Sequence, residues 1–386
     1  MEEGSSRRAA AALPDELIIE ILARLPAKSL CRSSCVSRAW RALISDPANR
    51  RRFAQTLSGI FFSRPHGSWG FVGLSTALPP SPDMDLCFLP LTCGKTELLD
   101  SCNGLLLLRC RGTPESPSPA FYIVCNPATE EWVSLPQPSR APGLNDGVND
   151  TYSAALGFDP AVSSDFHVFQ LFQEHFYDQE LFVVGVEIYS SKTGSWVFEE
   201  SRWSESDIRC TGQMTYFYGS LHFCIVSNAV ASVDTEGQIW RVSRVRHNAM
   251  YGYGSSICHS QGRLLYVHDD AWTNYNNTLS IYILEDHNSE EWTWNFKLSL
   301  YKSDLFGSRP AQMGWDYYMA AFHPEGDLVF FYDDRQKRLM SYDMKHRDVH
   351  VICTLGEVLE LVHGYDYDVH RLFLPYVPLF EGISFT

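Results

Sequence analysis

The sequence of 386 residues lacks the motifs that mark most membrane proteins, zinc proteins and hydrolases. No apolar run approaches the roughly 18 residues of a membrane-spanning helix, and the four alanines after Arg8 are too few for a signal-peptide core. There is no Cys-x-x-Cys pair, no His-Glu-x-x-His motif and no Gly-x-Ser-x-Gly turn. We therefore expect a soluble intracellular protein, cytoplasmic or nuclear or both, that uses no metal or other cofactor and does not contact a membrane.

Two partial motifs do not change this expectation. Gly94-Lys95-Thr96 is similar to the end of a phosphate-binding loop, but Leu89 occupies the place of the earlier glycine that such a loop requires. His346 and His350 are four residues apart, but their surroundings are strand-like and no metal-binding motif includes them. Neither pattern predicts a nucleotide or metal site.

The eleven cysteines are an odd number and are scattered along the chain. Five of them lie inside strand-like apolar runs: Cys87, Cys102, Cys125, Cys224 and Cys258. Cysteines in such positions are expected to be small buried hydrophobic residues in a reducing compartment.

Charge is distributed unevenly along the chain. Residues 1–57 carry 10 Lys and Arg against 6 Asp and Glu, a net charge of +4, whereas residues 58–386 carry 21 against 40, a net charge of −19. The basic segment suits an acidic partner, and the acidic remainder disfavours nucleic acid, whose phosphates require a basic surface. The acidic pairs Asp269-Asp270 and Asp333-Asp334 are expected to lie in solvated turns.

The stretch from residue 13 to residue 44 is the part of the sequence with a helical pattern. Its apolar residues Leu17, Ile18, Ile21, Leu22 and Leu25 recur on one helical face, and Asp15 and Glu16 oppose the positive end of the helix dipole. Shorter helices are expected over residues 28–35 and 37–44, and a fourth could begin at Asp46. Three helices of this size cannot bury all their apolar side chains among themselves, so a partner must cover the remainder.

The residues of this stretch closely follow the F-box pattern: Leu13-Pro14, Leu17, Ile21-Leu22, Arg24-Leu25-Pro26, Lys28-Ser29-Leu30, Val36-Ser37-Arg38 and Trp40-Arg41. This resemblance to the F-box implies docking onto a Skp-type adaptor, and through it onto the cullin and RING subunits of an SCF-type ubiquitin ligase. The adaptor-binding residues that it implies are Leu13, Pro14, Leu17, Ile21, Leu22, Leu25, Pro26, Leu30, Val36 and Trp40. The alternative is an amphipathic three-helix cap folded onto the chain's own second domain.

From residue 58 onward the sequence is typical of β-strands and contains an internal repeat. A glycine-centred turn precedes an apolar strand in SCNGLLLL at 101, FYGSLHFC at 217, SQGRLLYV at 260 and PEGDLVFF at 324. A second half of the repeat ends at Trp132, Trp196, Trp240 and Trp292. Interpreted as four-stranded antiparallel blades, the repeats span residues 98–135, 153–199, 212–242, 255–298 and 318–354.

Strand-like pieces near both ends of this region can supply a sixth blade: Ile60–Ser63, Phe71–Leu74, Leu86–Pro90, Leu359–His363 and Arg371–Val377. Pairing of N-terminal with C-terminal strands would close a ring and remove exposed sheet edges. We therefore predict a disordered leader (1–12), a small all-α F-box module of three helices (13–57) and an all-β propeller (58–386). Six blades are expected, with five or seven as the alternatives.

The repeats resemble kelch-like propellers, although they lack the paired glycines of a strict kelch repeat. NPATEEW at 126–132 and SCNGLLLL are similar to the F-box-associated domain of plant F-box proteins. The resemblance implies a non-enzymatic subunit whose propeller binds an unknown protein for ubiquitination. One alternative is a propeller enzyme that acts on a sugar or small metabolite and is tethered through its F-box, and another is an F-box protein that presents no substrate.

Long insertions are expected at one rim of the propeller, because successive turns of a four-stranded meander alternate between two rims. They are Arg109–Pro119, Pro136–Thr151, Gln173–Glu180, His268–Asn277 and Lys302–Asp316. We predict target binding by their aromatic residues Phe176, Tyr177, Trp272, Tyr275 and Trp315; the alternative is that these side chains only pack the loops against the ring. The loops hold 5 Lys and Arg against 10 Asp and Glu, which favours a neutral or basic target.

Overall fold

In a computed structural model, the chain divides into two compact units, residues 1–55 and 56–386. The structure describes residues 13–25, 27–46, 49, 57–64, 69–74, 86–90, 95–112, 119–139, 153–176, 180–203, 210–225, 228–246, 255–269, 278–285, 293–307, 316–355 and 373–379. The leader expected over residues 1–12 lies outside these ranges.

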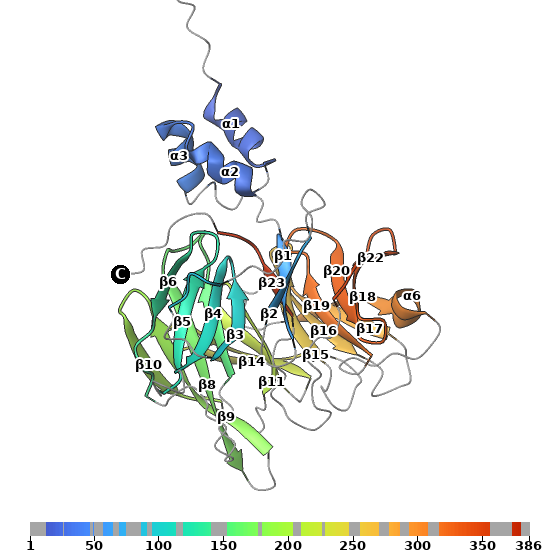
Figure 1. Ribbon diagram of the computed structural model, residues 1–386. Helices are drawn as coiled ribbons and strands as arrows, with labels where there is room; N and C mark the ends of the chain where they lie inside the picture. Colours follow the sequence, from blue (N-terminus) through green and yellow to red (C-terminus); the bar gives the residue numbers. More distant parts are fainter. Residues whose placement is uncertain are drawn as a thin grey trace, which may run out of the picture. The chain divides into compact units, whose positions relative to one another are not determined.

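The described part of the first unit is helical (Figure 1). It contains α1 (Asp15–Leu22), α2 (Ala27–Ser34) and α3 (Arg38–Ser45). Asp15 and Glu16 occupy the first turn of α1, and the Ser37 side chain caps α3 by accepting a hydrogen bond from the Trp40 backbone N–H at 3.1 Å. Most of the further helix expected from Asp46 lies outside the described residues.

The described strands of the second unit form six antiparallel sheets, which are the blades of a propeller (Figure 1). Blade 1 consists of β3 (Lys95–Cys102), β4 (Leu105–Arg111), β5 (Phe121–Asn126) and β6 (Glu131–Ser134), and blade 2 of β7 (Ser153–Phe158), β8 (Phe166–Phe176), β9 (Glu180–Ser190) and β10 (Ser195–Glu200). Blade 3 consists of β11 (Cys210–Phe217), β12 (Ser220–Ile225), β13 (Ala229–Asp234) and β14 (Trp240–Arg244). Blade 4 consists of β15 (Ser255–Ser260), β16 (Arg263–Asp269), β17 (Thr278–Leu284) and β18 (Trp294–Tyr301), followed by the short helix α6 (Lys302–Phe306). Blade 5 consists of β19 (Tyr317–Phe322), β20 (Leu328–Asp333), β21 (Arg338–Asp343) and β22 (Asp348–Thr354), and blade 6 of β1 (Gly59–Ser63), β2 (Trp69–Gly73) and β23 (Phe373–Tyr376).

The two ends of the propeller chain meet in blade 6, whose strand order is β2-β1-β23. β23 pairs antiparallel with β1, so that Phe61 lies opposite Leu374, and the Phe61 and Tyr376 rings make an edge contact at 5.5 Å. β23 also contacts β19 of blade 5 and β3 of blade 1. The innermost strands therefore follow one another around a closed ring, and the prediction of six blades closed by N-terminal and C-terminal strands is confirmed.

Two of the pieces expected in blade 6 are not strands of the described structure. Residues 86–90 form a turn, in which the Leu89 N–H donates to the Leu86 carbonyl at 3.0 Å. Their apolar side chains pack instead against the hydrophobic cluster between blades 6 and 1. The expected strand Leu86–Pro90 is therefore wrong, and Leu359–His363 lies outside the described residues.

The hydrophobic core lies between neighbouring blades. One buried cluster, for example, combines Leu107 and Tyr122 of blade 1 with Leu156 and Phe166 of blade 2. Cys102, Cys125 and Cys224 are buried and Cys258 is half-buried, as expected for small apolar residues. Cys87 is exposed, because it lies in the turn over residues 86–90 and not in a strand.

Three of the four glycine-centred turns of the repeat are tight two-residue hairpins, whereas the turn with Gly326 is longer and its glycine does not have a positive φ. Asn103 and Gly104 have φ angles of 46° and 94°, and Gln261 and Gly262 have φ angles of 51° and 67°. Positive φ at both central residues is the geometry of a type I′ turn, which matches the twist of the strands that it joins. The backbone conformation that these turns require therefore explains their glycines.

We expect Leu374→Ala to lower the free energy of unfolding by about 2–5 kcal/mol, because it removes a buried side chain from the strand that closes the ring. Val351→Ala, on the outermost strand of blade 5, is the control, because Val351 is 51% exposed and its loss should cost less than about 0.5 kcal/mol. Urea unfolding followed by tryptophan fluorescence measures both effects. Equally small effects from the two variants would contradict closure through β23.

Candidate functional site

The helical unit displays aliphatic side chains to solvent. Leu13, Leu17, Ile21 and Val36 have relative exposures of 52%, 51%, 48% and 65%. Leu17 and Ile21 lie four residues apart and therefore occupy one face of α1. An apolar face of this kind on a short helical unit offers a docking surface for a partner.

The opposite side of α1 forms the small core of the unit. Ile19 and Leu22 are buried there together with Ile44 of α3. The other apolar residues named by the F-box pattern, Leu25, Leu30 and Trp40, are half-buried around this core, Pro14 is exposed, and Pro26 lies outside the described residues. The F-box pattern places Leu22 among the adaptor-binding residues, but its side chain is fully buried in this core. Its position on α1 directs it towards α3.

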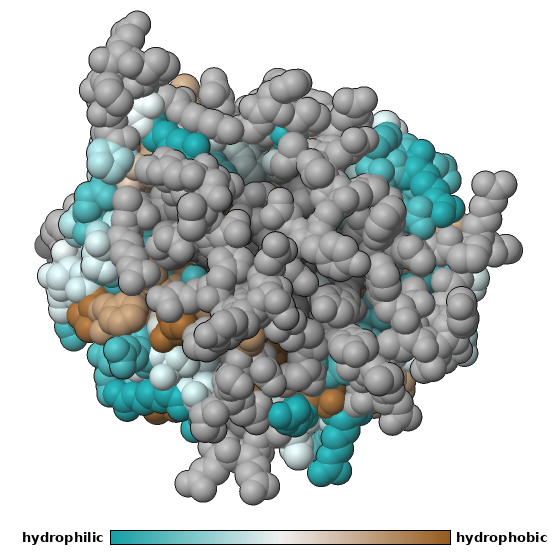
Figure 2. Space-filling view, turned by 90° about the horizontal axis from the view of Figure 1, so that it is seen from below, coloured by the Kyte–Doolittle hydropathy of each residue, from teal (hydrophilic) through white to brown (hydrophobic). Residues whose placement is uncertain are grey.

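The aromatic residues predicted to bind a target lie largely outside the described part of the chain. Tyr177, Trp272, Tyr275 and Trp315 are outside it, and Phe176 is the last residue of β8, where it lies opposite Glu180, but its side chain is not described. Their role stays a prediction. Figure 2 shows the molecule from below, where the described side chains form hydrophobic patches beside hydrophilic ones.

The hairpin of β8 and β9 extends beyond the rest of blade 2. β7 pairs with β8 only as far as Leu171, and β10 pairs with β9 only from Gly185 onward. The remaining residues of both strands pair only with each other and project as a two-stranded ribbon (Figure 1). The described residues of the predicted insertion Gln173–Glu180, which are 173–176 and 180, thus lie in this strand pair.

A charged pair is buried between blades 4 and 5. Lys302 and Asp269 are both fully buried and form an ion pair, and the Tyr317 hydroxyl donates to the second carboxylate oxygen of Asp269 at 2.6 Å. Burial, and then the neighbouring Asp269 carboxylate, raise the pKa of the Tyr317 hydroxyl well above its ordinary value, which keeps it a donor. The Phe306 ring stacks on Tyr317 with centroids 4.5 Å apart.

The interpretation of the acidic pairs as solvated turns is therefore wrong for Asp269, whose partner Lys302 lies 33 residues further along the chain. It is also wrong for Asp333, which is buried and accepts hydrogen bonds from the backbone N–H groups of Arg335 and Gln336 at 3.0 and 3.2 Å. Arg109, counted above with a solvent-exposed insertion, lies in β4 and forms an ion pair with Glu97 at 2.6 Å.

The described residues offer few groups for catalysis or metal binding. Among them, no group of three or more His, Cys, Asp or Glu side chains could hold a metal ion. The Asp269–Lys302–Tyr317 cluster is closed to solvent and its polar groups bind one another, so it stabilises the packing of blades 4 and 5. None of the described helices has the length and apolar character needed to cross a membrane.

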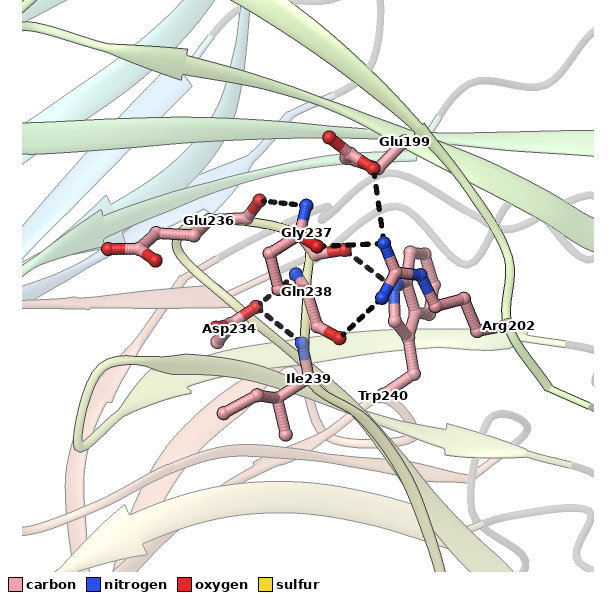
Figure 3. A network of polar contacts seen from close by, with 8 residues as sticks. All are labelled: Glu199, Arg202, Asp234, Glu236, Gly237, Gln238, Ile239 and Trp240. Carbon is pink, nitrogen blue, oxygen red and sulfur yellow. Dashed lines mark hydrogen bonds and ion pairs between the residues drawn. The ribbon is translucent and has the colours of Figure 1, made fainter.

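A polar network joins blades 2 and 3 at their outer edge (Figure 3). Arg202, which follows β10, donates to the Gln238 side chain at 2.7 Å and lies 3.8 Å from the Glu199 carboxylate. Asp234 holds the turn that carries Gln238, because its carboxylate accepts hydrogen bonds from the backbone N–H groups of Gln238 and Ile239 at 2.7 and 3.0 Å. Sequence reasoning missed this contact, because no local pattern links Arg202 to a turn in another blade.

The comparisons with known proteins agree with this architecture. Residues 69–360 match the family model described as "F-box protein At3g26010-like, beta-propeller", and residues 11–52 match the F-box domain. The F-box protein At5g49610 of Arabidopsis thaliana is 25% identical over 346 residues, which cover 85% of this chain and 90% of that protein. The F-box protein At5g07610 of the same plant is 31% identical over 200 residues, which cover 47% of this chain and only 44% of that protein.

Solved structures show only a general likeness. The β-propeller domain of Myceliophteria thermophila Cps50 (Swd1) matches with a TM-score of 0.42 and 9% identity, covering 78% of this chain and 83% of that chain. The family assignment therefore rests on the two family models, one of which spans most of the propeller. Given these matches, a helical N-terminal unit and a six-bladed propeller, the chain belongs to the family of F-box proteins with an At3g26010-like β-propeller.

Proposed function

We propose that this protein is a substrate-recognition subunit of an SCF-type ubiquitin ligase. The observation that carries the proposal is the exposure of Leu13, Leu17, Ile21 and Val36 in the F-box unit, of which Leu17 and Ile21 share one face of α1. A Skp-type adaptor would cover this face and connect the protein to the cullin and RING subunits. Because these side chains are about half exposed, covering each one contributes on the order of 1 kcal/mol, and four of them supply part of a stable interface.

The propeller would bind the protein to be ubiquitinated. In this arrangement the subunit performs no covalent chemistry, because holding the target near the charged conjugating enzyme raises the effective concentration of its lysines. The closed ring provides the rigid scaffold that binding loops require. We place the target at the rim with the long insertions, with Phe176, Tyr177, Trp272, Tyr275 and Trp315 as the proposed contacts.

The pairing of buried charges among the described residues supports a non-catalytic role. An enzyme acting on a sugar or metabolite needs a carboxylate or a base that its substrate can reach. The fully buried Asp269 and Lys302 satisfy each other and Tyr317, which suits a structural role.

The double variant Leu17→Ala and Ile21→Ala should weaken binding to a purified Skp-type adaptor at least a hundredfold, because each substitution removes about 2 kcal/mol or more at a packed interface. Its melting temperature should stay unchanged, since both side chains are half exposed. Isothermal titration calorimetry measures the binding, and the matched control is Val197→Ala with Val351→Ala on the propeller, which exchanges two similarly exposed side chains. Undiminished binding by the first double variant would overturn the proposed docking face.

Lys302→Met should lower the free energy of unfolding by about 3–5 kcal/mol, because it leaves the Asp269 carboxylate buried without its counter-charge. Adding Asp269→Asn should recover much of the loss, because the uncompensated charge is then gone. Thermal unfolding of the two variants tests this coupling. If Lys302→Met retained full stability, the ion pair would not stabilise the cluster that Asp269 forms with Tyr317 of blade 5, and a chemical role for Lys302 would gain support.

A further inference from the structure

Each complete blade has an equivalent side chain near the start of its fourth strand. The five cross-strand pairs are Trp132 with Cys125, Trp196 with Tyr189, Trp240 with Val233, Trp294 with Leu284, and Val349 with Tyr342. In every pair, the residue on the third strand belongs to the hydrophobic cluster shared with the preceding blade. Because cross-strand neighbours lie on the same face of a sheet, all five side chains face the preceding blade.

In blades 2 to 5, chain at or after the end of the preceding blade's fourth strand covers this side chain. The Trp196 indole donates to the Pro136 carbonyl at 2.7 Å, and the Trp294 indole donates to the Ser243 hydroxyl at 2.9 Å. The Trp240 ring contacts the Trp203 ring with centroids 4.6 Å apart. Val349 packs in one cluster with Leu305 and Phe306 of α6.

Trp132 of blade 1 differs from the other four. Its preceding blade is blade 6, which has three strands in the described structure, with β2 outermost. Trp132 remains 38% exposed, and no described residue makes a hydrogen bond to its indole. Among the described strands, the outermost strand of each complete blade also pairs on one side alone, but the side chain of this set that faces it is covered in blades 2 to 5.

The chain that directly follows β2 has a sequence that disfavours a strand. Residues 75–85 read STALPPSPDMD and include Pro79, Pro80 and Pro82. Proline has no N–H to donate to a strand ladder, so such a sequence disfavours pairing along β2. The described residues that come next, 86–90, form a turn and pack between blades 6 and 1.

We propose that the outer edge of β2 together with Trp132 binds an extended segment of a partner protein as the fourth strand of blade 6, in place of the chain's own Leu359–His363, which the sequence predicts in this blade and which lies outside the described residues. The other blades indicate the chemistry of this segment: an extended backbone, a carbonyl or hydroxyl acceptor for the indole, and an apolar group against its ring. Glu130 and Glu131 are exposed beside Trp132, so the segment should carry Lys or Arg. The proposal does not depend on adaptor docking, because it involves no residue of the helical unit.

The chain itself provides a probe of this chemistry. Residues 240–246, with the sequence WRVSRVR, contain the fourth strand of blade 3, the serine that accepts the Trp294 indole hydrogen bond, and three arginines. A synthetic acetylated and amidated peptide of this sequence should bind the full-length protein. Hydrogen–deuterium exchange should then slow in β2 but not in β22, the outermost strand of blade 5.

Trp132→Ala should weaken the binding of this peptide about tenfold or more, since a tryptophan at the centre of a contact contributes strongly to affinity. Val351→Ala, an exposed position on β22, is the matched control and should leave the affinity unchanged. A peptide with proline in place of its first valine should not protect β2. Normal melting of the Trp132 variant would exclude misfolding as the cause.

Three results would overturn the proposal. The first is protection at another strand in place of β2, and the second is unchanged affinity in the Trp132 variant. The third is concentration-dependent dimerisation of the protein that Trp132→Ala abolishes, because a second copy of the chain would then occupy this edge.

Discussion

The pairing of β1 with β23 is the constraint on which the propeller depends. These strands are separated by some 300 residues of sequence, yet Phe61 lies opposite Leu374, and β23 contacts the innermost strands on both sides. Without this pairing the two terminal blades would each expose a sheet edge and half of a hydrophobic cluster. The entropy lost in closing so long a loop grows only slowly with its length, so a short ladder with a buried face can close the ring.

The contacts between blades follow from the same ring. Because each blade buries one face against the next, polar groups at these contacts must find partners across the boundary. They do so through side chains that bind the neighbouring blade, as Trp196 binds Pro136, Arg202 binds Gln238, and Asp269 binds Tyr317. Such contacts between blades suit the proposed role of the propeller, which is to position a target for other subunits.

Much of this fold could be predicted from the sequence, because its signals are local. Glycines with positive φ, such as Gly104, mark the first turn of a blade, and the aromatic residue near the fourth strand marks its end. What the sequence could not show depends on distant partners: Asp269 appears solvated until Lys302 is placed beside it, and Leu22 appears uncovered until α3 packs against it. For the same reason Trp132 appears equivalent to Trp196 in the sequence, although the blade that it faces has three strands among the residues that the structure describes.

Native-state hydrogen exchange in β23 tests the closed ring most directly. If the ring depends on this strand, the amides of Phe373, Leu374 and Tyr376 should exchange only through global unfolding, with the same free energy as the inner strands of blades 2, 3 and 4. The free energy of opening measured for these amides should also fall with added urea as steeply as the free energy of unfolding of the whole propeller. The reason is that opening β23 would expose the same surface as global unfolding. Exchange of β23 through a low-energy local opening, while the five complete blades stay protected, would contradict this account.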